Sequence, residues 1–501
     1  MSETEKLIKN IYNLPTDDEE TWNTICNGNV IGIFQLGILG IHWSKQLKPR
    51  NIRQLSDLIS CIRPGMLDLK IDGKSATERF CNRKNGIEEI KFLHPSLEHI
   101  LKDSQGFICY QEDSIRLANE IAGFTPVESD LLRKAIGTKD VEIMSNLEKT
   151  FVEGCERTGK VDNETAKQLF EEIRKSQKYS FNLSHSISYS TISYWDAYCK
   201  THYPLDFYCE KLNQCHHKPK PKKAINQLVR DAQRNGFFIR SPKLEDVLED
   251  DTFGFYHKDD EIIFGINHIQ GIGESKIVKI HDKLNSIRSW MDALHSGIDK
   301  TTFVNLLSIG FFDFGKTRKE KIFEYNLFNK LSKREQNIVK DEKIDNVKES
   351  FHYLLNQVNV RRKEIIKSLI LTINEPPYSL EDDPLWINEI EVTLMGISLS
   401  YHKTETEISH ADTTCKEIND GKTTNSVVFV EIDDPKEYTI NKGKLKGQKM
   451  GSFSGSDHSG TCKFLIFGDT WVKYQSLLYD GALVTLVGNK SKDAFIINVV
   501  K

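Results

Sequence analysis

The hydrophobic pattern changes along this chain, so one repeating type of structure cannot account for all of it. Residues 1 to about 215 carry helix-capping signals and few runs of β-branched residues, which predicts a helical block. Lys218-Pro219-Lys220-Pro221-Lys222-Lys223 interrupts this pattern. Its prolines disfavour helix and its four lysines repel one another, which favours a linker or solvated turn. With 501 residues, the chain is long enough for two to four domains.

The second half of the chain changes from helix to strand. A mixed segment runs to about residue 330, and residues 331 to 383 are Lys/Glu-rich and predict helices that stop at Pro376-Pro377. From Glu389 onward we expect mainly strands. Short apolar runs bounded by Gly, Asp or Lys lie at residues 427–430, 464–467 and 482–488. Such runs indicate a small barrel or sandwich, so the expected fold class is multidomain α+β.

Composition limits the classes of partner. The net charge is -4 with both signs mixed, so any contact with nucleic acid must come from local basic patches. The sequence lacks a run of about 18 apolar residues, and its acidic start does not resemble a signal peptide, so we expect no membrane partner. The ten cysteines lack paired spacing, which favours a reducing cytoplasm. Because zinc sites usually need two ligand pairs, we expect no metal at the single cluster Cys209, Cys215, His216 and His217.

One helix can be placed from its two ends. Thr125-Pro126-Val127-Glu128 is a capping box with proline at the first helical position, and Gly137 stands where a C-cap glycine belongs. Arg133 and Lys134 then fall in the last turns, with Lys139 just beyond. The simpler interpretation is stabilisation of the helix dipole by cations. The functional alternative is a triphosphate clamp, since Arg forks two phosphate oxygens and Lys adds a point charge.

A second candidate is the polar segment of residues 179–189, YSFNLSHSISY. Asn182, Ser184 and His185 supply neutral donors and acceptors suited to a sugar or phosphate, and Tyr189 offers a flat face for a base. The alternative is an N-capped helix whose aromatic residues belong to the core. From composition alone, the two interpretations are balanced for His185.

These two segments, in this order, resemble the family C replicative polymerases, the bacterial-type DNA polymerase III alpha subunits. Residues 131–139, LLRKAIGTK, resemble the fingers segment Leu-Leu-Arg-Arg-Ala-Met-Gly-Lys-Lys of that family. Residues 178–185, KYSFNLSH, resemble its Gly-Tyr-Gly-Phe-Asn-Lys-Ser-His. Five flanking segments also match in the family order: residues 31–36 (IGIFQL), 63–65 (RPG), 110–112 (YQE), 151–154 (FVEG) and 200–204 (KTHYP).

The resemblance implies a helical fingers domain that closes on an incoming deoxynucleotide. It implies that Arg133, Lys134 and Lys139 contact the triphosphate. It also implies that the nucleotide pocket is bordered by Asn182, Ser184, His185 and Tyr189.

Three positions depart from the family pattern. The Glu that follows Phe-Gln-Leu in the family is Gly37 here, its second fingers Arg is Lys134, and the Lys of Asn-Lys-Ser-His is Leu183. At the nucleotide site, Lys134 therefore weakens one charged feature and Leu183 removes another.

A later glycine-rich turn extends the resemblance. Gly271-Ile272-Gly273 opens a helix, and glycines there let the backbone approach a phosphate while the helix-start amides donate to it. Such a turn alone is commonly structural. The family has a similar segment in its helix-hairpin-helix region, which holds DNA without reading sequence. The resemblance implies DNA contacts at Gly271, Gly273 and Lys276.

The strand-rich end resembles the OB-fold that closes these polymerases, with matches at residues 391–400 and 444–453. Lys446 and Lys449, with the rings of Phe453 and Phe464, could serve single-stranded DNA, the charges for phosphate and the rings for bases. For each Phe taken singly, a place in the core of the barrel is the simpler interpretation. The expected domains are fingers (1–215), helix-hairpin-helix, little-finger-like (216–330), helical connector (331–385) and OB-fold (386–501).

The carboxylates needed for catalysis are not recognised in this sequence. Nucleotidyl transfer uses two metal ions about 4 Å apart, held by carboxylates. In the family these come from a palm segment, Pro-Asp-x-Asp-x-Asp-Phe, which precedes the Phe-Gln-Leu segment. Acidic pairs such as Asp17/Asp18 and Asp382/Asp383 lie in turn-like or highly charged contexts instead. We therefore expect no catalytic residue here, and Mg²⁺ held by a palm on another chain.

Two hypotheses follow from the resemblance. In the first, the chain is one piece of a split DNA polymerase in the cytoplasm of a bacterium or of a virus-infected bacterial host. Its partners would be template-primer DNA, dNTP, a palm-bearing chain and, as in the family, a sliding clamp, although no clamp peptide is recognised. In the second, it is a non-catalytic DNA-binding or polymerase-associated module.

Overall fold

Short polar side chains begin several helices in the first half of the chain. In the computed structural model, Asp18, Asn51 and Ser75 each accept a hydrogen bond from the backbone N–H three residues on, which satisfies a group that a helix start leaves unpaired. The structure describes residues 10–138, 141–176, 179–250, 253–405, 410–421, 426–440, 445–491 and 494–501. It divides the chain into two compact units, Met1–Tyr208 and Cys209–Lys501.

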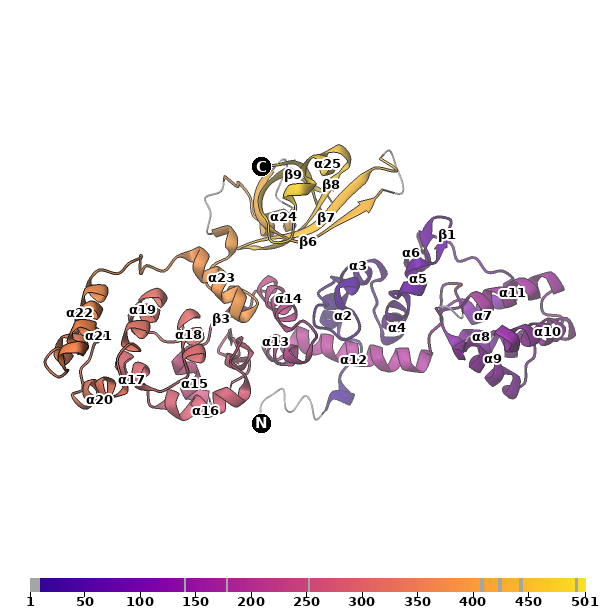
Figure 1. Cartoon of the computed structure of the whole chain (residues 1–501). Helices are drawn as coiled ribbons and strands as arrows, with labels where there is room; N and C mark the ends of the chain where they lie inside the picture. The colour runs from indigo at the N-terminus through magenta and orange to yellow at the C-terminus, as the bar shows by residue number, and fades with distance from the viewer. Residues whose placement is uncertain are drawn as a thin grey trace. The chain divides into compact units, whose positions relative to one another are not determined.

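The first unit is almost entirely helical (Figure 1). Its α-helices are α2 (Glu19–Cys26), α3 (Gly37–Leu47), α4 (Ile52–Cys61), α5 (Pro64–Asp68), α6 (Ala76–Lys84), α7 (Glu98–Leu101), α8 (Gln111–Glu120), α9 (Pro126–Thr138), α10 (Val141–Thr158), α11 (Asn163–Ser176) and α12 (Leu183–His202), and α13 (Pro204–Asn213) crosses into the second unit. A short hairpin, β1 (Lys70–Ile71) and β2 (Lys74–Ser75), joins α5 to α6. The single-turn 3-10 helices are η1 (Ile11–Asn13) and η2 (Pro95–Leu97).

The expected start of α9 is confirmed and its expected end is wrong. Thr125 N donates to Glu128 Oε2 at 2.7 Å and Glu128 N donates to Thr125 Oγ1 at 3.3 Å, which is the reciprocal capping box. The helix continues through Gly137 to Thr138, so Gly137 does not stop it. A glycine inside a helix costs only about 1 kcal/mol relative to alanine, which the surrounding helix can tolerate.

The helices α8 to α11 share one hydrophobic core. Leu117, Phe151 and Phe170 are fully buried in it, and the rings of Phe151 and Phe170 lie 5.3 Å apart. Burial of each such side chain stabilises the fold by roughly 1.5–3 kcal/mol. This core holds α8 and α9 together and so fixes two of the elements that carry candidate functional residues.

The second unit begins with helices and ends in a barrel. Its helices are α14 (Pro221–Arg234), α15 (Leu244–Asp250), α16 (Glu274–Asn285), α17 (Trp290–His295), α18 (Lys300–Ser308), α19 (Arg318–Phe328), α20 (Lys333–Asp341), α21 (Val347–Leu354), α22 (Val360–Asn374), α23 (Pro384–Met395), α24 (Cys415–Asn419) and α25 (Gly468–Tyr474). A small sheet is ordered β3 (Phe238–Arg240), β5 (Glu261–Ile263), β4 (Tyr256–Lys258). The 3-10 helices are η3 (Gln214–His217), η4 (Ile266–His268), η5 (Lys403–Glu405) and η6 (Gln475–Leu477).

Two local expectations in this unit need correction. The expected linker or solvated turn holds for residues 218–220, which form an exposed bend. Pro221, Lys222 and Lys223 instead form the first turn of α14, because proline is well suited to the first position of a helix. Strands do not begin at Glu389. That region is α23, which starts at the cap residue Asp383 with Pro384 next to it and ends at Gly396, whose φ is 85°.

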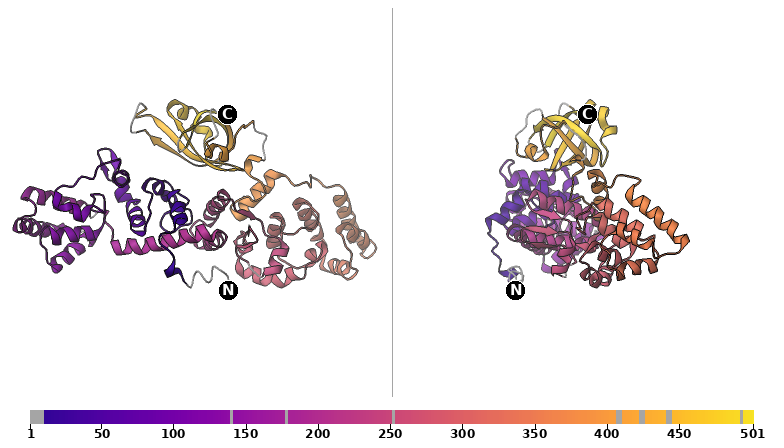
Figure 2. Two further views of the ribbon diagram at one scale, coloured as in Figure 1. Left: turned by 180° about the vertical axis from the view of Figure 1, so that it is seen from behind. Right: turned by 90° about the vertical axis from the view of Figure 1, so that its left-hand side faces the viewer.

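Five strands close into a barrel, seen in yellow in Figures 1 and 2. They are β6 (Ser426–Thr439), β7 (Lys449–Asp457), β8 (Gly460–Phe467), β9 (Leu483–Ser491) and β10 (Ala494–Val500), in the order β10-β8-β7-β6-β9. The pair β8 and β10 is parallel and the other neighbours are antiparallel. The helix α25 follows the third strand. This is the five-stranded barrel of the OB type predicted from the sequence.

Candidate functional site

The helix α12 carries the polar segment singled out in the sequence. Asn182 is its N-cap and accepts a hydrogen bond from His185 N at 2.8 Å. One turn further, the buried Ser186 hydroxyl lies 2.8 Å from Ser56 Oγ and 3.0 Å from Ser60 Oγ, both on α4. α12 packs against α4 and α2 (Figure 1). Its inner face is therefore fixed, and residues on the opposite face are presented outward.

The loop that precedes α12 is held from two sides. Glu112, on α8, accepts from Asn182 Nδ2 at 3.0 Å and from Leu183 N at 2.9 Å. The guanidinium of Arg63 lies 4.0 Å from the centre of the Phe181 ring and donates to Tyr179 O at 2.9 Å. These contacts involve two motif segments, residues 63–65 and 110–112, to which sequence reasoning assigned no role. The sequence marks these two segments only by their position in the order of the family motifs.

Four rings form a row along the N-terminal half of α12. Ring centroids are 5.3 Å apart for Phe181 and His185, 3.9 Å for His185 and Tyr189, and 5.1 Å for Tyr189 and Phe34. His185 is exposed and Phe34 is 36% exposed. His185 is therefore not enclosed in apolar packing. We call these four residues the ring row; Phe34 and His185 are its exposed members, and Phe181 and Tyr189 are partly buried.

Phe34 reaches the ring row because its loop is fastened to α12. Its N–H donates to Asp196 Oδ2 at 2.9 Å, and Ser193 Oγ donates to Phe34 O at 2.8 Å. Buried Lys200 donates to Ile31 O at 2.8 Å. The next residue after Phe34, Gln35, has a φ of 64°, a conformation that costs a non-glycine residue energy. The contacts to α12 outweigh this cost and hold the turn.

A buried acidic network lies behind α12. Tyr110 Oη donates to Asp57 Oδ1 at 2.7 Å and lies 3.1 Å from Ser56 Oγ, which connects it to α12. Asp113 accepts from Tyr110 N at 2.9 Å. Burial raises the pKa of Asp57 to about 6 and that of Asp113 to about 7, although Arg53 near Asp57 partly opposes the shift. The network is sealed from solvent and is a structural support of the ring row.

The proposed triphosphate clamp lies on a different helix. Arg133 Nη2 lies 2.8 Å from Asp130 Oδ1 and Lys134 Nζ lies 2.9 Å from Asp130 Oδ2, and all three side chains on α9 are more than 40% exposed. These two cations lower the pKa of Asp130, with Lys134 the larger contributor. Lys139 lies outside the described residues.

The structure brings together only some of the predicted site residues. Asn182, His185 and Tyr189 lie together at the start of α12. Arg133 and Lys134 lie on α9, which contacts α8, and α8 contacts the α12 cap through Glu112.

The glycine turn opens α16 as expected. Gly271 has a φ of 80°, which favours glycine, and Gly273 is the N-cap of α16. Lys276 Nζ donates back to Gly271 O at 2.9 Å. Asn305, on α18, donates to Gln270 O at 2.8 Å and so braces the turn. The element before the turn is the single-turn η4, so the first helix of the hairpin motif is short.

The barrel residues behave differently from one another. Lys446 is exposed in a turn, and Lys449 pairs with Glu437. Phe453 and Phe464 are 3% and 0% exposed and face each other across β7 and β8 with centroids 5.6 Å apart. Their rings fill the core of the barrel, so the suggestion that they stack on bases is wrong.

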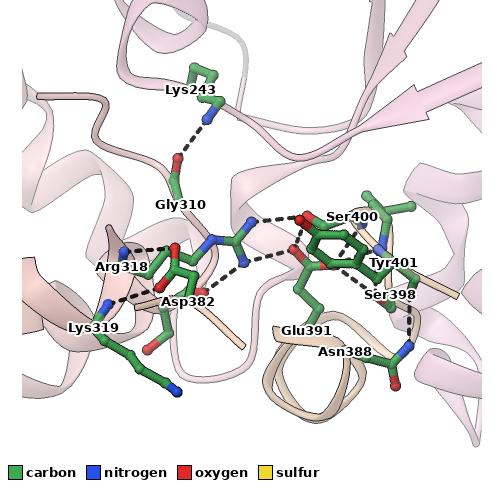
Figure 3. Close-up of polar contacts among 12 residues, drawn as sticks. Lys243, Gly310, Arg318, Lys319, Asp382, Asn388, Glu391, Ser398, Ser400 and Tyr401 are labelled. Atoms are coloured by element: carbon green, nitrogen blue, oxygen red, sulfur yellow. Dashed lines mark hydrogen bonds and ion pairs between the residues drawn. The ribbon is translucent and has the colours of Figure 1, made fainter. Parts of the chain in front are cut away.

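A polar node joins α18, α19 and α23 to residues 398–400 (Figure 3). The buried Glu391 carboxylate, on α23, accepts from Arg318 Nη1 at 2.8 Å, from Leu399 N at 2.8 Å and from Ser400 N at 2.9 Å. Arg318, on α19, also donates to the carbonyl of Ser308, the last residue of α18, at 3.0 Å. The node ties α18, α19, α23 and the segment that leads to the barrel into one hydrogen-bonded unit.

Within the described part of the chain, no group of three or more His, Cys, Asp or Glu side chains is placed to hold a metal ion. Those described residues therefore do not fit a two-metal catalytic centre. Among the helices of the described residues, none is both long and apolar enough to cross a membrane.

Comparisons with known proteins agree with the motifs. Residues 1–159 match the family model of the bacterial DNA polymerase III alpha subunit finger domain. The DNA polymerase III alpha subunit of Aquifex aeolicus is 27% identical over 98% of this chain and 39% of that protein. The corresponding values are 27%, 97% and 42% for Pseudomonas aeruginosa, and 26%, 98% and 43% for Staphylococcus aureus strain MW2. The chain spans about two fifths of the length of these relatives. The resemblance predicted from the sequence is confirmed.

Proposed function

We propose that this chain, which is similar over 98% of its length to a bacterial DNA polymerase III alpha subunit, is the part of a replicative DNA polymerase that binds dNTP and template-primer DNA. The observation that carries the proposal is the ring row on α12, with exposed His185 next to the clamped polar loop. In this proposal the expected fingers, helix-hairpin-helix and OB-fold domains divide the contacts with nucleotide and DNA.

The base and sugar of the nucleotide would contact the ring row. Tyr189 and Phe34 supply ring faces, and exposed Ser184 and His185 supply polar atoms at the start of α12. Asn182 has both ends of its side-chain amide engaged, by His185 N and by Glu112, so its part is to shape the loop.

The triphosphate would meet Arg133 and Lys134. Both now share Asp130, but exposed ion pairs of this kind are screened by solvent and contribute little to stability. Exchange of Asp130 for a phosphate therefore costs little, and Arg can bind phosphate oxygens in a bidentate manner. The proposal requires α9 to bring these cations toward the α12 loop when nucleotide is bound.

Mg²⁺ is assigned to a palm on a partner chain. The two-metal chemistry needs clustered carboxylates, and the described residues place none in such a group. The role of this chain is then to bind and orient nucleotide and DNA. A sliding clamp would be a further partner of the complete polymerase.

Primer extension tests the proposal. The chain alone should extend no primer, and addition of a palm-bearing partner should give activity above that of the partner by itself. In that complex, Arg133→Ala should weaken dNTP binding about 10- to 100-fold, because a charge-assisted contact contributes about 1.5–3 kcal/mol. The matched control is Arg361→Ala, at an exposed position on α22. Equal affinities for both variants would refute the clamp.

The second candidate function is a non-catalytic DNA-binding module. Leu183 and Gly37 favour it, because the family has charged residues at both positions. This candidate predicts DNA binding without any gain in the activity of a palm-bearing partner, so the same primer-extension assay separates the two.

A further inference from the structure

The lysine run at residues 218–223 lies on the surface beside the glycine turn. Lys218, Lys220, Lys222 and Lys223 are all exposed, the first two before α14 and the last two in its first turn. Repulsion among four neighbouring lysines is unfavourable unless an anion or solvent compensates it. Their placement can therefore show whether they only contact water or extend a binding surface.

Two contacts fix the run next to the turn. His216, in η3 just before the run, packs its ring 5.5 Å from that of His268, which ends η4 just before the turn. Lys222 Nζ donates to the side chain of Gln270, the residue before Gly271, and to Thr393 O at 2.6 Å. Lys222 thus acts as a strut between α14, the turn and α23.

The other lysines of the run differ in their surroundings. Among the described residues, Lys218 and Lys220 make no ion pair. Lys223 is near Asp434, whose pKa is lowered first by its own partner Lys436 and then by Lys223. Lys218, Lys220 and Lys223 therefore flank Lys222, which contacts the residue before the turn, and the helix-start amides of that turn suit a phosphate.

We propose that Lys218, Lys220 and Lys223 extend the glycine turn into one continuous surface for the phosphates of duplex DNA, independent of sequence. This inference rests on the proposed DNA contact at Gly271 and Gly273 and deepens it. Phosphate contacts of this kind set affinity and position without reading bases.

The size of the effect follows from counter-ion release. Each phosphate neutralised makes the slope of log affinity against log salt concentration more negative by about 0.9, so three contacts make it more negative by about 2.7. Between 50 and 200 mM salt, the affinity of the wild-type chain should then fall about 40-fold more than that of a variant without the three contacts.

The test measures duplex DNA affinity against salt for the whole chain. The variant carries Lys218→Ala, Lys220→Ala and Lys223→Ala, and Lys222 is kept because it braces the turn. The control carries Lys330→Ala, Lys340→Ala and Lys348→Ala, three exposed positions with the same change in net charge. The expected result is a slope less negative by about 2.7 in the first variant and an unchanged slope in the control.

Each outcome decides a separate claim. An unchanged slope in the first variant, or an equal fall in the control, overturns the lysine surface while leaving DNA binding by the chain in place. Absence of duplex binding by the wild-type chain overturns the proposed DNA contact at the turn itself. Thermal unfolding of both variants checks that the substitutions leave the fold intact.

Discussion

Replacing Glu391 with glutamine tests the polar node of Figure 3. The carboxylate is fully buried and accepts hydrogen bonds on both oxygens, from Arg318 and Ser400 on Oε1 and from Ser398, Leu399 and Ser400 on Oε2. Glutamine keeps the shape but offers one accepting oxygen and an NH₂ group. At least one donor then faces another donor, and Arg318 loses its buried counter-charge.

The loss can be scaled from these contacts. Removal of one partner from a buried ion pair costs about 3–5 kcal/mol, and the side chain of Arg318 is only 13% exposed, so solvent screens the pair weakly. We take about 3 kcal/mol, which corresponds to roughly a hundredfold change in a local opening equilibrium. The increase in local opening should be largest in the segment from Ser398 to Ser400.

Hydrogen exchange at the amides of Leu399 and Ser400 measures this directly. Glu391→Gln should speed their exchange roughly a hundredfold, while Glu389→Gln, at an exposed position on the same helix, should stay within about 0.5 kcal/mol. Exchange in Glu391→Gln within twofold of the wild-type rate would refute the reasoning. So would an equal effect of Glu389→Gln.

Three further changes test other parts of the structure. Burial raises the pKa of Asp57 to about 6, so ionisation of Asp57 destabilises the native state, and the stability contributed by this group falls as pH rises from about 4 through 6. The melting temperature of Asp57→Asn relative to wild type should therefore rise over that pH range. A constant difference in melting temperature would contradict this reasoning. Glu112→Gln should speed exchange of the Leu183 amide about tenfold, since one acceptor at the loop is lost; unchanged exchange would show that Glu112 does not hold the loop. Phe464→Ala should destabilise the barrel by about 3–5 kcal/mol in denaturant unfolding, and weaker DNA binding at unchanged stability would contradict its place in the core.

Features that depend on neighbouring residues could be predicted from the sequence. The start of α9 follows from Thr125 and Glu128, which lie three residues apart. The barrel strands follow from apolar runs that end at turn residues. The helix α23 was not predicted although its signal is local: Asp383 and Pro384 are a cap and a first helical residue. The apolar run after them suggested a strand, because short apolar runs fit both structures.

Features that depend on distant residues could not be predicted. Glu112 and Arg63 hold the loop before α12 from 70 and 116 residues away in sequence, so no local pattern reveals them. The same holds for Phe34, which completes the ring row only because its loop is fastened to α12. The site residues chosen from the motifs thus include His185 and Tyr189 of the row and leave out Phe34, Glu112 and Arg63.

The position of β10 in the barrel has a consequence for how the chain folds during synthesis. This strand pairs with β8 on one side and β9 on the other, and Phe495 lies opposite Phe464 although the two are far apart along the chain. Until β10 has left the ribosome, β8 and β9 expose unpaired backbone groups that another chain could occupy. Nascent molecules stalled before Ala494 should therefore be prone to self-association, and a chaperone would bind the exposed strands β8 and β9 at that stage.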